Sequence, residues 1–297
     1  MTAETPVHPA GGDKDGLATV DLINANGGKA FPVQADVTNP GEVWAMRSHV
    51  MRRMGGRPPN VVICNSGLSE SGYILGRPPT VIPGESTATR RARARKLFVD
   101  SLEQSRAVMD TKLDGFLTMT HLWAGEAVND GEPLQIVYIS SRQAFEPGAG
   151  VPGYVAANWG VLSYPNILAV NLGKLASLVS ACSVALPFVR TGMTQAYAEN
   201  PKVFGRWQPR MLEPHEASQA LLQLLAQPRE ATNRRTYQMN VAAAEDDVRV
   251  TWSEIQIQTT PAAAPWSDEQ PLLLHKESTN GAQVPAGRPI RGAIAPL

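Results

Sequence analysis

The residues best placed to do chemistry lie between Ile136 and Asn158, in the segment IVYISSRQAFEPGAGVPGYVAAN. Ser141 ends a run typical of a buried strand, and Tyr154 opens a helix thirteen residues later, after a loop rich in Gly and Pro. Two such hydroxyls can hold a carbonyl oxygen between two donors. A tyrosine with a pKa of about 10 becomes an acid-base group near neutral pH when a nearby cation favours the phenolate.

Lys112 and Asn158 complete this candidate set. Asn158 follows Tyr154 by four residues, so the two share a helix face. Lys112 lies on the preceding helix, in the segment TKLDG. The strand serine and the Tyr-x-x-x-Asn pattern resemble the short-chain dehydrogenase/reductase family, which usually has lysine after the tyrosine and asparagine on the earlier helix. The exchange of these two residues resembles the ketoreductase domains of polyketide synthases.

The resemblance implies an NAD(P)H-dependent oxidoreductase that reduces a carbonyl substrate of the ketoacyl type. Tyr154 would protonate the developing alkoxide, and Ser141 would hydrogen-bond the carbonyl oxygen. Lys112 would lower the pKa of Tyr154 and relay protons, while Asn158 would hold Lys112 or a water in place. The resemblance, and nothing else in the sequence, favours NADP(H) over NAD(H) as the cofactor.

Three further segments resemble the cofactor-binding parts of this family and follow one another in its order. They occur at the end of an early strand, at the end of the next strand, and after the strand that follows the tyrosine helix. The cofactor-binding residues that the resemblance implies are Asp36, Val37, Asn65, Ser66, Gly67 and Thr191. We expect no metal site, because the histidines show no metal-ligand spacing with one another or with a cysteine.

One part of the family pattern is missing from the sequence. Members begin with a strand and a glycine-rich turn whose following helix receives the cofactor pyrophosphate. The early cluster Gly11-Gly12 follows no strand. The sequence therefore predicts an amino-terminally truncated domain, and it leaves open a second interpretation. In that alternative the chain is a non-catalytic remnant or fragment that acts as an interaction module.

Short β-branched runs alternate with helical patterns over most of the chain. The predicted strands are 30–37, 60–64, 134–140, 178–184 and 236–240, and the predicted helices are 15–26, 41–54, 96–129, 154–172 and 214–225. This alternation is typical of an α/β fold with a doubly wound, Rossmann-like parallel sheet. Ligands of such folds bind at the carboxyl ends of the strands, where the candidate residues are expected.

The composition changes near both ends of the chain. We expect residues 1–14 to be disordered or to hold part of a second strand, and residues 15–240 to form the domain. The alternation of apolar and polar residues at 248–258 predicts a further strand or hairpin within 241–260. Residues 261–297 are rich in Pro and Ala and predict a mobile tail, so the expected fold has a partly disordered C-terminus.

Composition also limits the partners and the compartment. The 27 acidic and 27 basic residues give no net charge, which argues against nucleic acid. No apolar stretch reaches the roughly 20 residues that span a bilayer. Two cysteines, far apart, suit a reducing compartment, so we expect a cytoplasmic protein. The expected partner is a small-molecule or acyl-carrier-bound carbonyl substrate, in a homo-oligomer or a multienzyme. The basic run at 90–96 is either a solvated helix face or a docking site for an anionic carrier.

Overall fold

The computed structural model of the protein describes residues 12–70, 82–146, 151–198, 200–245 and 247–257. All of them lie in the first of two units, Met1–Thr259. Two expectations fall outside the described residues, namely the partial strand near the amino terminus and the tail at 261–297. Of the segment 1–14, only residues 12–14 are described, and they open the first helix, α1 (Gly12–Ala25).

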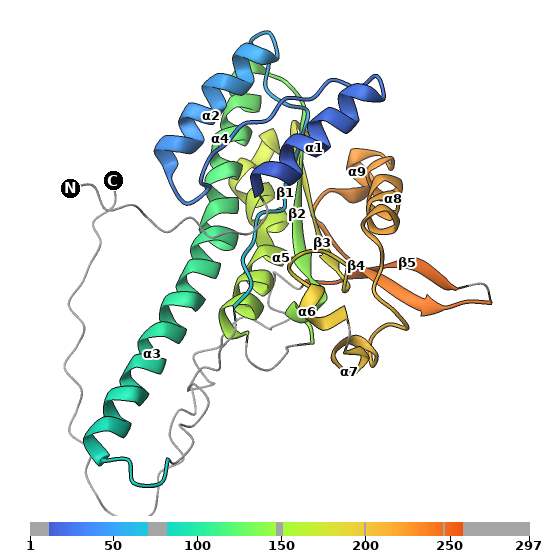
Figure 1. The fold of residues 1–297 in the computed structure, drawn as a ribbon. Coiled ribbons are helices and arrows are strands. Elements are labelled where there is room, and N and C mark those ends of the chain that lie inside the picture. Colours follow the sequence, from blue (N-terminus) through green and yellow to red (C-terminus); the bar gives the residue numbers. More distant parts are fainter. Residues whose placement is uncertain (1–11, 71–81, 147–150, 199, 246, 258–297) are drawn as a thin grey trace, which may run out of the picture. The chain divides into compact units, whose positions relative to one another are not determined.

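A five-stranded sheet runs through this unit in the order β1-β2-β3-β4-β5 (Figure 1). The first four strands pair in parallel, and the fifth pairs antiparallel to the fourth. Their bounds are β1 (Val61–Cys64), β2 (Leu134–Ser141), β3 (Val179–Leu186), β4 (Arg235–Ala243) and β5 (Val248–Ile255). The predicted doubly wound parallel sheet is confirmed, and the strand predicted within 241–260 corresponds to β5.

Helices cover both faces of the sheet, which explains why β2 and β3 are buried along nearly their whole length. On one face, α4 (Gly115–Asp130) and α5 (Pro152–Leu172) pack on a core that includes Ile136 and Tyr138. On the other face, α8 (Pro214–Leu225) packs against Val137 and Val184 through Leu224 (Figure 1). These layers hold the carboxyl ends of the central strands in fixed positions.

The helix predicted at 96–129 is three consecutive pieces. They are α3 (Thr87–Met109), a π-helical turn (Asp110–Asp114) and α4. A π turn inserts one extra residue into a helical turn, and such turns occur often at functional sites. Lys112 is part of this turn. Gly131 ends α4 with a φ of 69°, a left-handed conformation that glycine adopts without strain.

The prediction of a buried strand at 30–37 is wrong. These residues belong to no helix or strand, and they alternate between half-buried and exposed positions. A strand needs a hydrogen-bonded neighbour, and β1, the first strand of the described sheet, pairs only with β2 there. The outward side chains of β1, Val61 and Ile63, are accordingly 45% and 47% exposed.

The remaining elements are short, apart from one helix near the amino terminus. The helix predicted at 41–54 is α2 (Pro40–Arg53), whose first turn is capped by Asn39. The others are α6 (Gln195–Ala198), α7 (Pro201–Phe204), α9 (Arg229–Thr232) and two 3-10 turns, Arg142–Ala144 and Gly173–Ser177. Among the helices of these described ranges, none has the length and apolar character of a membrane span.

Candidate active site

Two cavities share a wall at the carboxyl ends of the central strands. The larger has a volume of about 440 Å³, and the smaller has about 70 Å³. Ser141, at the end of β2, and Tyr154, in the first turn of α5, line both cavities. This is the position at which parallel α/β sheets bind ligands.

The hydroxyl of Ser141 has a fixed environment. Its Oγ accepts a hydrogen bond from the backbone N–H of Gln143 at 3.2 Å, within the 3-10 turn that follows β2. This contact leaves the hydroxyl proton free to be donated elsewhere, because a serine oxygen can accept one bond while it donates another. Ser141 can therefore donate to a carbonyl oxygen in the cavity.

The phenol of Tyr154 is buried, and burial raises its pKa because the phenolate loses its hydration. The polar side chains of Ser141 and Asn158 act in the opposite direction and lower the pKa, whereas Lys112, which was expected to lower it, is not among the causes of the shift. The phenol is therefore held in its protonated form at neutral pH, with two polar side chains positioned to accommodate the phenolate. Such a group can donate a proton.

Lys112 lies in the wall of the larger cavity and is only 4% exposed. Burial lowers its pKa to about 8, and the neighbouring Cys64 acts in the opposite direction. Its Nζ lies 4.9 Å from the centre of the Phe116 ring. The ammonium therefore faces Cys64 and this ring. Its pKa lies close enough to neutral pH for Lys112 to exchange protons.

Asn158 is fully buried beneath the turn that carries Tyr154 and lines neither cavity. Its Nδ2 donates to the backbone carbonyl of Tyr154 at 2.8 Å, and its backbone carbonyl accepts from Ser140 Oγ at 2.8 Å. Its Oδ1 is buried and has no hydrogen-bond partner among the described residues. A buried acceptor of this kind is suited to a water or a ligand donor.

Four of the candidate cofactor residues lie together, and two lie elsewhere. Those that line the larger cavity are Asn65, Ser66, Gly67 and Thr191. Asp36 and Val37 line neither cavity. The Asp36 carboxylate accepts from the backbone and hydroxyl of Thr38, at 2.9 and 2.8 Å, and Val37 packs against Gly115 at the start of α4.

The larger cavity has the lining of a small-molecule site. Gly67 lies next to Lys112, and a Cβ at this position would be in ordinary van der Waals contact with Lys112 Nζ, at 3.5 Å. Amide and hydroxyl groups of Asn65, Ser66 and Thr191 supply polar contacts, and Leu186 and Pro187 supply an apolar wall. This mixture of apolar surface and a few polar groups is typical of cofactor sites.

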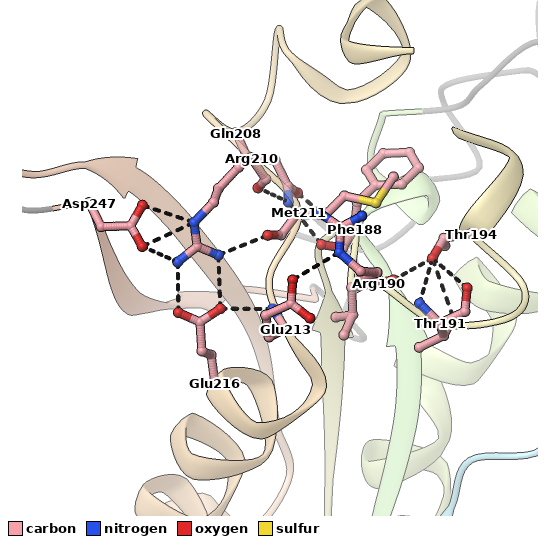
Figure 2. Close-up of polar contacts among 11 residues, drawn as sticks. Phe188, Arg190, Thr191, Thr194, Gln208, Arg210, Met211, Glu213, Glu216 and Asp247 are labelled. Carbon is pink, nitrogen blue, oxygen red and sulfur yellow. Dashed lines mark hydrogen bonds and ion pairs between the residues drawn. The ribbon is translucent and has the colours of Figure 1, made fainter. Parts of the chain in front are cut away.

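The segment after β3 is held in place by side chains from farther along the chain (Figure 2). The Gln208 amide pairs with the backbone of Phe188 in both directions, at 2.9 and 2.8 Å. Arg190 donates to Glu213 at 2.8 Å. Thr194 Oγ1 accepts from the backbone of Thr191 at 3.0 Å and donates to the carbonyl of Val189. Thr191 and Thr194 are thus fixed at the rim of the larger cavity.

A cluster of charged side chains lies next to the segment after β3 (Figure 2). Arg210 forms paired hydrogen bonds with the carboxylates of Glu216 and Asp247. The guanidinium lowers the pKa of Glu216 to about 2 and also lowers that of Asp247. The Glu216 carboxylate also accepts a hydrogen bond from the backbone N–H of Glu213 at 2.7 Å, and this bond is part of the capping box of α8.

Several residues of the cleft had no signal in the sequence. Ser69, Tyr197 and Trp207 line the smaller cavity, together with Phe188 from the segment after β3 that the sequence did single out. The rings of Phe188 and Trp207 stack with their centroids 5.7 Å apart. Next to this cavity, Glu70 is 5% exposed and hydrogen-bonds the backbone of Tyr154. A glutamate in a connection between elements normally indicates a solvated loop, so sequence reasoning could not single it out.

Comparisons with known proteins agree with this arrangement. The family model for short chain dehydrogenases matches residues 9–202. A search of curated proteins returned no match.

Two solved structures share the fold. One is a short-chain type dehydrogenase/reductase from Mycobacterium marinum, with 21% identity, a TM-score of 0.56, and coverage of 73% of this chain and 74% of that one. The other is a protein from Agrobacterium tumefaciens assigned as a gluconate dehydrogenase, with 20% identity, a TM-score of 0.59, and coverage of 75% and 79%. With its sheet, its cleft and its family match, the chain belongs to the short-chain dehydrogenases, a family of NAD(P)(H)-dependent oxidoreductases.

Proposed function

We propose that the chain reduces a carbonyl compound of the ketoacyl type through Ser141, Tyr154, Lys112 and Asn158. The observation that carries this proposal is the shared wall of the two cavities. Ser141 and Tyr154 face both a space that fits a nicotinamide and a space that fits a small substrate group, while the buried Lys112 borders the first. The exchanged positions of Lys112 and Asn158 are the feature in common with polyketide synthase ketoreductases.

The larger cavity is the proposed nicotinamide site, with Asn65, Ser66, Gly67 and Thr191 as its contacts. Asp36 and Val37 are proposed for the adenine end, by resemblance to the family. The bound nicotinamide would supply the hydride. We favour NADP(H) over NAD(H), also by resemblance, and a cofactor titration with both forms decides between them.

The protein side of the reaction is a proton transfer. Ser141 donates a hydrogen bond to the carbonyl oxygen and orients it, and Tyr154 donates its phenolic proton to the same oxygen as reduction proceeds. Lys112, whose pKa is about 8, returns a proton to the site from its buried position. Asn158 holds the first turn of α5 through the Tyr154 carbonyl and offers its free Oδ1 to a water or to Lys112.

The smaller cavity limits the substrate. Its volume of about 70 Å³ suits a small group next to the reacting carbonyl, and its lining combines aromatic rings with the polar side chains of Arg142 and Glu146. A small molecule or the acyl end of a carrier-bound chain has this shape. We propose a cytoplasmic enzyme, working as a homo-oligomer or within a multienzyme, since no charge pattern suggests nucleic acid or membrane as a partner.

Tyr154→Phe tests the proposal. It removes the phenolic proton and keeps the ring, so the rate of cofactor-dependent carbonyl reduction should fall by about 10²–10⁴-fold. Tyr237→Phe is the matched control, because its hydroxyl donates to the Ala231 carbonyl at 3.2 Å and lines neither cavity. An unchanged rate in Tyr154→Phe would refute the assignment of the proton donor.

A further inference from the structure

We infer that Glu70 is a positioning residue that fixes the two opposite walls of the cleft relative to each other. The loop after β1 carries Gly67 into the larger cavity and Ser69 into the smaller one. The opposite wall is the first turn of α5, with Tyr154. Glu70 is the side chain that joins this loop to that turn.

The contacts of Glu70 are short and use both carboxylate oxygens. Oε1 accepts a hydrogen bond from the backbone N–H of Tyr154 at 2.6 Å, and Oε2 accepts from Ser105 Oγ on α3 at 2.7 Å. The side chain is 5% exposed, so water does not compete with these bonds. Bonds to an ionised acceptor are about twice as strong as neutral ones.

The first turn of α5 needs such a partner. The first N–H groups of a helix have no acceptor within the helix. Val151, at the position before α5, has no polar atom in its side chain with which to cap the turn. The carboxylate of Glu70 supplies the missing acceptor at Tyr154, and its charge also suits the positive end of the helix dipole.

The packing around this junction leaves no room for a side chain at Gly153. A Cβ added to Gly153 would lie 2.7 Å from both the Cα and the carbonyl oxygen of Ser105. The α3 and α5 backbones therefore touch where Glu70 accepts from the Ser105 hydroxyl of α3 and from the Tyr154 backbone of α5. Because this contact leaves no room for the turn to move toward α3, we expect loss of the acceptor to let it move away from α3 and to displace Tyr154.

The effect on rate rests on the proposed function, whereas the effect on the backbone does not. Glu70→Ala should increase hydrogen exchange at the amides of the first turn of α5. It should also lower kcat for carbonyl reduction by about ten- to a hundred-fold, the loss typical of a shift of about 1 Å, with a smaller change in KM. Glu70→Gln keeps an oxygen acceptor for Tyr154 and should restore most of both properties. Ser105→Ala removes only the second bond and should give a smaller change in the same direction.

Glu126→Ala is the matched control, because Glu126 is a similarly buried carboxylate that bonds Arg47 on α2, away from both cavities. It should lower the melting temperature and leave exchange in α5 and kcat unchanged. If Glu70→Ala behaves like Glu126→Ala, or if Glu70→Gln is as damaged as Glu70→Ala, the inference is overturned. A wild-type protein without reductase activity would refute the proposed function, and the exchange measurement would still decide the role of Glu70.

Discussion

Gly153 and Ser105 approach so closely that a side chain on the glycine would overlap the serine backbone, with a Cβ only 2.7 Å from the Ser105 Cα. Backbone atoms cannot rotate away as a side-chain end can. This contact fixes the distance between α3 and the first turn of α5, one residue before Tyr154. The position of the candidate proton donor therefore depends on a residue that has no side chain.

Gly153→Ala should consequently damage both stability and activity. We expect a loss of about 1–3 kcal/mol in the free energy of unfolding, which is typical of overpacking, and a loss of up to about a hundred-fold in carbonyl reduction. The loss would occur although alanine has the higher helix propensity. Urea unfolding and steady-state rates measure the two effects.

Gly160→Ala is the control on the same helix. Its Cβ would lie 2.8 Å from Leu113 Cδ1, which is the flexible end of a side chain and can move aside. This variant should be near wild type in both measurements. Equal effects at the two glycines would show that helix packing in general, and not the contact with Ser105, determines the outcome.

Lys112→Met should change how stability depends on pH. Burial lowers the pKa of Lys112 to about 8 from its ordinary value of 10.5. Between these values the unfolded chain holds a proton that the folded chain has lost, so the wild type gains stability as pH rises, by up to about 1.4 kcal/mol per pH unit. Below pH 8 the buried ammonium is a cost that methionine removes.

The measurement is the difference in unfolding free energy between wild type and Lys112→Met from pH 7 to pH 10. The variant should be at least as stable as the wild type at pH 7 and should lose that advantage as pH rises. Cys64 does not cancel in this difference, because burial raises the pKa of its thiol to about 12 and Lys112 acts in the opposite direction. The thiol affects stability only above pH 9, so the change between pH 8 and pH 9 is the decisive one. Parallel stability curves for the two proteins would contradict a buried, titrating Lys112.

The sequence was sufficient for the parts of the fold that depend on local pattern. Runs of five to seven residues predicted strands at 60–64, 134–140 and 178–184, which correspond to β1, β2 and β3. Both faces of β2 and β3 are covered, whereas alternate side chains of β1 are exposed. The proline at position 214 and the apolar spacing after it predicted α8 with its observed bounds, Pro214–Leu225. Segment 30–37 has the same local pattern but forms no strand, since pairing depends on a neighbour that local pattern does not contain.

In the candidate site, too, the residues that depend on local pattern were predictable and those that depend on folding were not. The spacing of Ser141 and Tyr154 follows from one strand, one loop and one helix, and the structure places both side chains on the same cavities. The π turn around Lys112 has no sequence signature, and it was predicted as plain helix. Glu70 bonds to residues 35 and 84 positions away, a relationship that exists only after folding. The catalytic roles themselves stay predictions.

Arg210→Met should loosen the segment that holds Thr191 and Thr194. It removes the cation shared by Glu216 and Asp247 and leaves the capped end of α8 with uncompensated carboxylates. We expect faster hydrogen exchange at 187–194 and weaker cofactor binding, together with a lower melting temperature. Arg235→Met is the control, because Arg235 pairs with Glu254 across β4 and β5 and lines neither cavity. Normal exchange at 187–194 in Arg210→Met would show that Gln208, Arg190 and Thr194 hold the segment without the Arg210 cluster.

Gly67→Val should block the larger cavity. A Cβ at this position would be in ordinary contact with Lys112 Nζ, at 3.5 Å, and the two methyl groups of valine need further space, which they would take from the cavity proposed for the nicotinamide. In fluorescence titrations with reduced cofactor, the wild type should bind saturably and Gly67→Val at least ten-fold more weakly. Gly125→Val is the control, since a Cβ there meets nothing within 4 Å. Wild-type protein that fails to bind at millimolar cofactor would favour the non-catalytic interaction module. Equal binding by wild type and Gly67→Val would instead move the cofactor out of this cavity.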